Sequence, residues 1–254
     1  MAHESGHPLI VIIGATCSKK SALASQIQSM LGYPIVNCDL YKAYQYTDIW
    51  VNQISNDKLK NLNYHLYQFI DPFTVMNAAI FQKIARKKIQ TLLSKSPVIL
   101  LGGSGLYMNS IVFNEYKFHN VGKQKRPKSF TNYFPHTKII GLKWDQQELY
   151  QNINQRVDKY MNSSLDIPKL IYLKYKGTAL AKAIGYREWF DYFNNQKTIT
   201  ETLELIKKNT RNYAKRQLTW YRHQYPQAQW YPITNNSTNE IFQKIIGDIK
   251  KWKK

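Results

Sequence analysis

The sequence predicts an α/β fold in which helices cover both faces of a mostly parallel sheet. Short apolar runs alternate with longer segments of helical spacing, an alternation typical of parallel sheets. The runs cover residues 8–13, 34–37 and 97–101, and the helical segments between them cover 18–31 and 80–93. Ligands of such sheets bind at the carboxyl ends of the strands, so functional side chains are expected there.

Each of these first elements has a local signal of its own. The run at 8–13 is β-branched and lies between a proline and Gly14, as expected of a short buried strand. The helix at 18–31 ends before Gly32, a residue that commonly stops helices. The segment at 80–93 places its apolar residues on one face, which predicts an amphipathic helix.

The second half of the chain is expected to be mostly helical. Residues 137–142 form one more predicted strand, and Asp145 with Glu148 resembles a capping box that opens a helix toward Met161. Further helices are expected over 178–193, over 200–223 and from Asn239, with a short segment at 228–231.

The order of the predicted strands and helices divides the chain into two structural parts. Residues 1–142 form the predicted α/β core, and they include a polar, lysine-rich stretch at 114–135. Residues 143–254 form a helical part that completes this core.

The charge points to a polyanionic partner. The chain has 36 Lys and Arg against 16 Asp and Glu, a formal net charge of +20. Nucleic acid is the first candidate and an anionic membrane surface the second, while a merely solvated basic surface is the alternative. Two cysteines, Cys17 and Cys38, exclude a disulfide scaffold. We expect neither a transmembrane helix nor a secretory leader, and we expect a cytoplasmic location.

The turn after the first strand resembles a phosphate-binding loop. Residues 14–21 read G-A-T-C-S-K-K-S, whereas a P-loop has Gly, four residues, Gly, Lys and then Ser or Thr. Gly14, Lys20 and Ser21 fit this pattern, but Lys19 occupies the place of the second glycine. A left-handed backbone at a residue with a side chain costs about 1–2 kcal/mol, a penalty that a ligand or packing can offset.

Two other strand ends carry polar groups. Asp39 follows the second strand, where a carboxylate accepts a proton or holds a metal-bound water; the alternative is an ordinary turn residue. Residues 102–107 read G-G-S-G-L-Y, whose glycines allow a backbone to approach an anion and whose Ser104 adds a hydroxyl. Any tight turn between a strand and a helix could also have this composition.

The predicted helix at 200–223 carries a basic face. Between Leu205 and Asn239 there are six Lys or Arg and no acid. Helical spacing places Ile206, Tyr213 and Trp220 on the opposite face, where they are expected to pack inward. The basic face suits a nucleic-acid backbone, and it consists of Lys208, Arg211, Lys215 and Arg222.

Taken together, the motifs resemble those of the tRNA dimethylallyltransferases, also called tRNA isopentenyltransferases or the IPP transferase family. Along the chain they read G-x-T-x-S-x-K-S, C-D-L-Y-K-A-Y, Y-H-L then I-D-P, G-G-S-G-L-Y, I-N-Q-R-V-D-K-Y-M, A-I-G-Y-R-E and A-K-R-Q-L-T-W. The resemblance implies a P-loop nucleotide-kinase-like fold with an insertion domain. It also implies transfer of a dimethylallyl group from dimethylallyl diphosphate to the exocyclic amine of the adenosine 3′ of the anticodon.

The resemblance also implies residue roles. Asp39 would be the general base and Arg156 would contact the leaving diphosphate, with Thr16 and Ser104 completing the catalytic set. Ser21 would bind Mg²⁺. The implied diphosphate-binding set is Gly14, Ala15, Thr16, Cys17, Ser18, Lys19, Lys20, Ser21, Gly102 and Gly103. The set implied to face the tRNA anticodon stem-loop is Lys42, Gly185, Tyr186, Arg187, Lys208, Arg211, Lys215, Arg216, Gln217 and Arg222. Family members are expected to be monomers.

This chain departs from the family pattern at several positions. The family has glycine in place of Lys19, Ser-Arg-Gln in place of residues 40–42, and arginine in place of Asn152. It also has a glycine-containing segment in place of residues 48–50, and its helical insertion is reduced here to the stretch at 114–135.

The basic run 123–128 is hypothesised to replace part of that insertion in tRNA binding. Its deletion is expected to weaken tRNA binding and to flatten its salt dependence.

Two alternatives to dimethylallyl transfer remain at this point. One is a family member that binds RNA but has lost catalysis, which Lys19 and the triplet after Asp39 favour. The other is a small-molecule kinase that uses ATP, for which the acid-free basic helix has no purpose.

Overall fold

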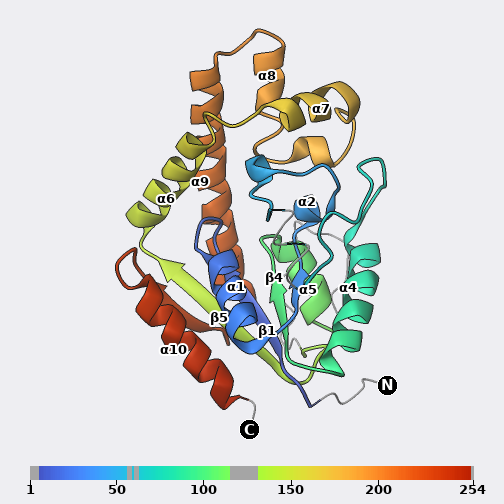
Figure 1. The fold of residues 1–254 in the computed structure, drawn as a ribbon, viewed down its shortest axis with the longest axis vertical. Helices are drawn as coiled ribbons and strands as arrows, with labels where there is room; N and C mark the ends of the chain where they lie inside the picture. Colours follow the sequence, from blue (N-terminus) through green and yellow to red (C-terminus); the bar gives the residue numbers. More distant parts are fainter. Residues whose placement is uncertain (1–5, 56–58, 60–62, 115–130, 253–254) are drawn as a thin grey trace.

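A computed structural model describes residues 6–55, 59, 63–114 and 131–252, and it shows a six-stranded, all-parallel sheet (Figure 1). The strand order is β3-β2-β4-β1-β5-β6. Their bounds are β1 Leu9–Gly14, β2 Ile35–Asn37, β3 Tyr64–His65, β4 Val98–Leu101, β5 Thr137–Trp144 and β6 Gln229–Ile233. The predicted parallel sheet is therefore confirmed.

The central strand β1 explains why the first apolar run is continuous. All six of its residues are buried, because helices cover both faces of the sheet. Val11 lies opposite Leu100 of β4 and Ile139 of β5 in the parallel register. This register brings the ends of β1, β2 and β4 to the same edge of the sheet.

Two groups of helices cover the sheet. On one face, Ile10 and Ile12 pack with α1 (Lys20–Leu31), α6 (Gln146–Lys159) and α10 (Thr238–Lys251). On the other, Leu9, Val11 and Ile13 pack with α4 (Ala78–Leu93) and α5 (Gly105–Val112). The predicted helices of the first half thus lie where the α/β pattern requires them.

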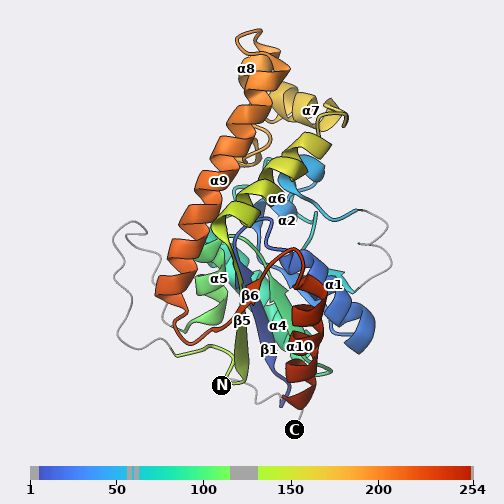
Figure 2. The ribbon, with the colours of Figure 1, turned by 90° about the vertical axis from the view of Figure 1, so that its left-hand side faces the viewer.

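The longest helix, α9 (Ile199–Gln224), joins the core to the carboxyl edge of the sheet. It lies beside α6, and both helices extend beyond the sheet toward α7 (Asp166–Lys174) and α8 (Trp189–Phe193) (Figure 2). The short segment predicted at 228–231 is strand β6, which pairs with β5. The second half of the chain therefore supplies two strands of the sheet, β5 and β6, as well as helices.

The predicted continuous helix at 178–193 is wrong. A 3₁₀ turn, Leu180–Lys182, and the short helix α8 are separated by a break at Gly185, whose φ is +100°. A Cβ at Gly185 would lie 2.1 Å from the carbonyl oxygen of Trp50. Close packing of this glycine against a distant segment ends the helix, and the local sequence carries little sign of that contact.

The capping box predicted at Asp145 is half formed. The Asp145 carboxylate accepts hydrogen bonds from the backbone amides of Gln147 and Glu148, as an N-cap does. The Glu148 carboxylate, however, accepts from the backbone amide of Asn235. It therefore ties α6 to the turn before α10.

The expected reduced insertion falls mostly on residues 115–130, which lie outside the described residues, as does the basic run 123–128. The residues on either side of it meet, because Phe113 and Asn132 form an antiparallel bridge. Along the described ranges, no helix has the length and hydropathy needed to cross a membrane.

Candidate active site

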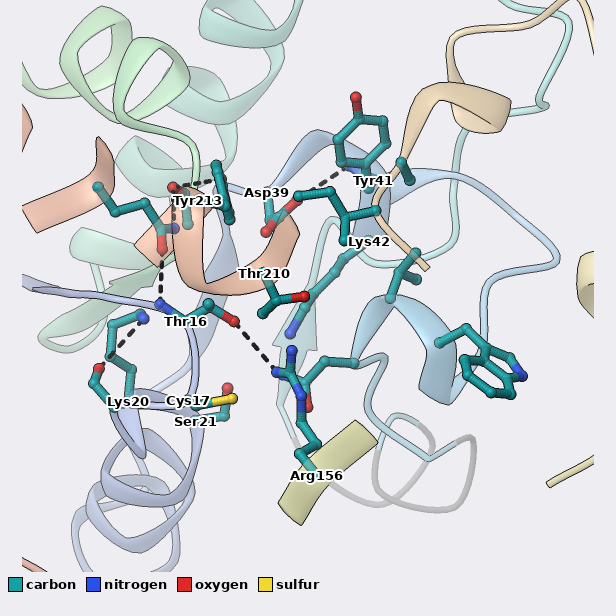
Figure 3. Close-up of a pocket in the computed structure, with 18 of the residues that line it drawn as sticks. Thr16, Cys17, Lys20, Ser21, Asp39, Tyr41, Lys42, Arg156, Thr210 and Tyr213 are labelled. Atoms are coloured by element: carbon teal, nitrogen blue, oxygen red, sulfur yellow. Dashed lines mark hydrogen bonds between the residues drawn. The ribbon is translucent and has the colours of Figure 1, made fainter. Parts of the chain in front are cut away.

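A cavity of about 710 Å³ lies at the carboxyl edge of the sheet (Figure 3). The loops after β1, β2 and β4 line it together with α6 and α9, and this is the edge of the sheet at which a ligand is expected. Eight of its lining residues are Lys or Arg, and Asp39 is the one acid among them. The described part of the cavity is therefore strongly positive and suits an anionic ligand.

Lys19 adopts the left-handed conformation that the loop pattern assigns to glycine. Its φ and ψ are 60° and 18°, and α1 begins at the next residue. The Lys19 ammonium donates to Thr238 Oγ1 at 3.1 Å and lies 5.1 Å from the centre of the Trp144 ring. These two contacts stabilise the side chain and offset part of the backbone strain.

The buried Lys20 points back into its own loop. Its ammonium donates to the carbonyl oxygens of Gly14 and Ala15, the first at 2.9 Å. Burial, followed by the nearby charge of Lys42, lowers the pKa of Lys20 to about 7. A bound anion would raise this pKa again, because its negative charge stabilises the ammonium. Lys20 therefore holds its proton more firmly when an anion occupies the cavity.

A chain of hydrogen bonds joins the loop to α6 and α9. Arg156 of α6 donates to Thr16 Oγ1 at 3.2 Å, and the Thr16 amide donates to Gln217 Oε1 at 2.7 Å (Figure 3). Gln217 then donates to the Gly103 carbonyl at 2.7 Å. The Nε of Arg156 is buried and has no partner in the described residues, so the hydrogen-bonding capacity of this arginine is only partly used.

Asp39 is held at the start of a short helix, α2 (Leu40–Ala43). Its Oδ1 accepts from the Tyr41 amide at 3.1 Å, and its own amide donates to Asn37 Oδ1 at 2.9 Å. No hydrogen bond from a described residue reaches its Oδ2. Asp39 is thus both a turn residue and a carboxylate with an oxygen available in the cavity.

The glycine turn is needed for packing. A Cβ at Gly102 would lie 2.6 Å from the Cys38 backbone, and one at Gly103 would lie 2.9 Å from Gln217 Nε2. Ser104 begins α5 and does not line the cavity, and Gly14 and Ala15 contribute only carbonyls to Lys20. The catalytic role expected of Ser104 therefore has no support from its position.

The basic face of α9 is mostly exposed, as predicted. Arg211 is the exception: its side chain is half-buried and donates to Asn154 Oδ1 at 2.6 Å. Exposed side chains of this set are Lys208, Lys215, Arg216 and Arg222, and Arg187 lies at the cavity rim with 46% of its side chain exposed.

Three residues expected to face tRNA are internal. Tyr186 is buried and donates to Asp48 Oδ1 at 2.9 Å, while Gly185 packs against Trp50. Gln217 is 5% exposed and links two loops of the cavity. A contact with tRNA through Tyr186 or Gly185 is not supported, because their surfaces are covered by other parts of the chain.

The inward face of α9 lines the cavity, a role that the sequence did not assign: Gln217 was expected to face tRNA, Ile206 and Tyr213 only to pack inward, and Thr210 was not singled out. Ile206, Thr210, Tyr213 and Gln217 line the cavity from successive turns of the helix. The Tyr213 hydroxyl donates to the Gly103 carbonyl at 2.9 Å, and burial raises the pKa of this phenol, which keeps it a donor. The sequence signal for this role was the helical spacing that predicted an inward face, together with the polar residues Thr210, Tyr213 and Gln217 on that face.

The sheet order and the loop at the end of β1 define a P-loop-like α/β protein. The family model described as "IPP transferase" matches residues 42–133 and 115–224. A tRNA dimethylallyltransferase of Oenococcus oeni is 31% identical, with 96% of this chain and 95% of the relative covered. A tRNA dimethylallyltransferase of Carboxydothermus hydrogenoformans is 27% identical over 94% of this chain and 96% of its own.

A solved tRNA delta(2)-isopentenylpyrophosphate transferase of Staphylococcus epidermidis has the same fold. Its TM-score is 0.83 at 22% identity, with 96% of this chain and 99% of that chain covered. The chain described here belongs to the IPP transferase family. The alignment with the Carboxydothermus relative extends over 307 positions, more than the 254 residues of this chain, so this member lacks segments that the relative has.

Proposed function

We propose that this chain is a tRNA dimethylallyltransferase, which transfers a dimethylallyl group from dimethylallyl diphosphate to the exocyclic amine of an adenosine in tRNA. The observation that supports this most is the positive cavity at the P-loop with a single carboxylate. Lys20 and Arg156 line the cavity and are the proposed ligands of the diphosphate. Asp39 also lines it and provides an acceptor for a proton.

The reaction needs little beyond these groups. The adenosine nitrogen attacks the allylic carbon, a C–N bond forms, and the C–O bond to the diphosphate breaks with its electron pair on oxygen. Lys20 and Arg156 neutralise the charge that develops on this leaving group. Asp39 Oδ2 accepts the proton that the amine loses, so atoms and charges balance.

We also propose Mg²⁺ as the cofactor. No group of three His, Cys, Asp or Glu lies together in the described part of the chain, but Mg²⁺ needs few protein ligands when a substrate supplies phosphate oxygens. The Ser21 hydroxyl lines the cavity at the start of α1 and fits this role. When bound, the ion supplies further neutralisation of the diphosphate.

The proposed tRNA site consists of the rim of the cavity and the exposed face of α9. Lys208, Lys215, Arg216 and Arg222 provide phosphate contacts, and Arg187 at the rim lies close to where the target base must enter. The proposed target is the adenosine 3′ of the anticodon, and the proposed acting form is a cytoplasmic monomer.

The test is mass spectrometry of digested tRNA after incubation with dimethylallyl diphosphate and Mg²⁺. Wild-type protein is expected to yield isopentenyl-adenosine, and Asp39→Asn is expected to lower the rate by about 10²–10⁴-fold. Asp71→Asn is the matched control, because Asp71 also accepts an amide two residues ahead, at 2.8 Å from Phe73, but is exposed and off the cavity.

The alternatives give different results in the same assay. Tight, salt-dependent tRNA binding with no product would favour an RNA-binding protein that has lost catalysis. Transfer of phosphate from ATP to a small molecule, without any tRNA product, would favour the kinase.

A further inference from the structure

Lys42 is a cation of the cavity that the implied roles assign to tRNA. Its backbone is fixed, because its carbonyl accepts from the Gln68 amide and from Gln53 Nε2, each at 3.0 Å. Its side chain extends from α2 into the cavity, and its ammonium points toward the guanidinium of Arg156 (Figure 3). Lys42 therefore enters the cavity from α2, whereas Lys20 belongs to α1 and Arg156 to α6.

This ammonium has no ion pair or hydrogen bond with any described residue. Burial lowers the pKa of Lys42; the charge of Asp39 acts in the opposite direction, and that of Arg156 lowers it further. Lys42 in turn lowers the pKa of Lys20, so the three cations repel one another. Asp39 is the one acid lining the described cavity, and its single negative charge does not neutralise the three positive charges.

Two further donors belong to residues that line the same cavity. The Nε of Arg156 and the Nδ2 of Asn152, one turn earlier on α6, are buried and unpartnered within the described ranges. Converging cations and unused donors are complementary to a ligand with several charged acceptor oxygens. A diphosphate has that chemistry, whereas an RNA phosphate carries a single charge.

We propose that Lys42 is a third cationic ligand of the diphosphate, beside Lys20 and Arg156. This inference rests on the proposed function. In this chain residue 152 of α6 is an uncharged asparagine, whereas residue 42 of α2 is a lysine. Lys42 thus adds a positive charge from α2 to a cavity that α6 lines with Asn152 and Arg156.

The experiment measures binding of inorganic pyrophosphate in the presence of Mg²⁺ by titration calorimetry, and binding of unmodified tRNA by filter assay, on the full chain. Lys42→Gln is expected to weaken pyrophosphate binding by about 10- to 100-fold, the effect of losing a charge-assisted contact. Its tRNA affinity is expected to stay within about twofold. Lys42→Arg keeps the charge and is expected to bind pyrophosphate more tightly than Lys42→Gln.

Lys83→Gln is the control, since it removes one positive charge from an exposed position of α4 that is not part of the cavity lining. It is expected to bind pyrophosphate as the wild type does, and a loss equal to that of Lys42→Gln would make the effect one of net charge and overturn the proposal. Thermal melting of each variant shows that it is folded. A Lys42→Gln variant with wild-type pyrophosphate affinity, or one that loses only tRNA affinity, would overturn it too.

The outcomes also separate this inference from the proposed function. Lys42-dependent pyrophosphate binding without any isopentenyl-adenosine would leave the diphosphate contact standing and remove the transferase activity. Product formation with Lys42-independent pyrophosphate binding would do the reverse. A wild-type protein that binds no pyrophosphate would overturn both.

Discussion

Two loops meet at the cavity, residues 14–21 and 102–105, and they differ in where glycine is required. In the first, Lys19 and Cys17 have φ values of 60° and 61°, a region that favours glycine, yet both carry side chains. In the second, Gly102, Gly103 and Gly105 have no positive φ, yet a Cβ on any of them would lie within 3 Å of a neighbour. The space around Cβ, more than the backbone angle, decides which positions must stay glycine in this site.

The largest effect on stability is expected from Gly102→Ala. The added methyl would meet the Cys38 backbone at 2.6 Å, and a backbone cannot move aside as a flexible side chain can. We expect the free energy of unfolding to fall by about 1–3 kcal/mol, and activity to fall because Asp39 follows Cys38 directly. Urea denaturation and the product assay measure the two effects.

Gly247→Ala is the matched control for this substitution. Gly247 lies within α10, and a Cβ added there would meet no other atom within 4 Å. Alanine at this position is expected to raise stability by about 0.5–1 kcal/mol. A Gly102→Ala protein as stable as the wild type would break the comparison between the two loops.

The next effect concerns Lys20, the titrating group of the first loop. Its pKa is lowered to about 7, so above that pH the empty protein holds it largely neutral, and binding of a diphosphate returns the proton. Affinity should therefore fall as pH rises above 7, by up to about tenfold per unit. The contribution of this group to the stability of the empty protein should rise with pH between 7 and its ordinary value, because only the unfolded chain is protonated there.

Calorimetry at pH 8.5 in two buffers of different ionisation enthalpy measures this proton uptake directly. The charges that act on Lys20 besides burial are those of Lys42, Cys17, Asp39 and Arg156, so Lys20→Met is the variant that isolates the group. Uptake that is the same in wild type and Lys20→Met would assign the proton to another of these groups.

A smaller effect is expected when two variants of Lys19 are compared, one that removes only its side-chain contacts and one that also relieves its backbone strain. Lys19→Ala loses the contacts with Thr238 and Trp144 but keeps the left-handed backbone, whereas Lys19→Gly loses the contacts and relieves the strain. The glycine variant is expected to be more stable than the alanine variant by about 1 kcal/mol. Equal urea midpoints for the two would mean that the backbone angle carries no penalty here.

The smallest effect is expected for Ser104. Its hydroxyl caps nothing at the start of α5 and does not line the cavity, so Ser104→Ala is expected to change kcat/KM by less than about threefold. Thr16→Ala, which removes the acceptor of the Arg156 hydrogen bond, is expected to lower it by about tenfold or more. A large loss in Ser104→Ala alone would restore the catalytic role that the sequence implied.

The sequence determined the core and the edge of the sheet on which the site lies. The buried strands were predictable because a strand covered on both faces is a continuous apolar run, visible without any knowledge of its neighbours. The turn at residues 14–21 and the carboxylate of Asp39 followed for the same reason, since parallel strands bring their carboxyl ends together.

Only the tertiary structure decided which side chains meet in the cavity. The break at Gly185 depends on Trp50, and the place of Gln217 depends on Thr16 and Gly103. Each of these contacts joins residues far apart in the chain, and a local pattern cannot encode a partner that it does not contain. Periodicity therefore indicated which face of α9 is inward, while long-range packing made that face part of the site.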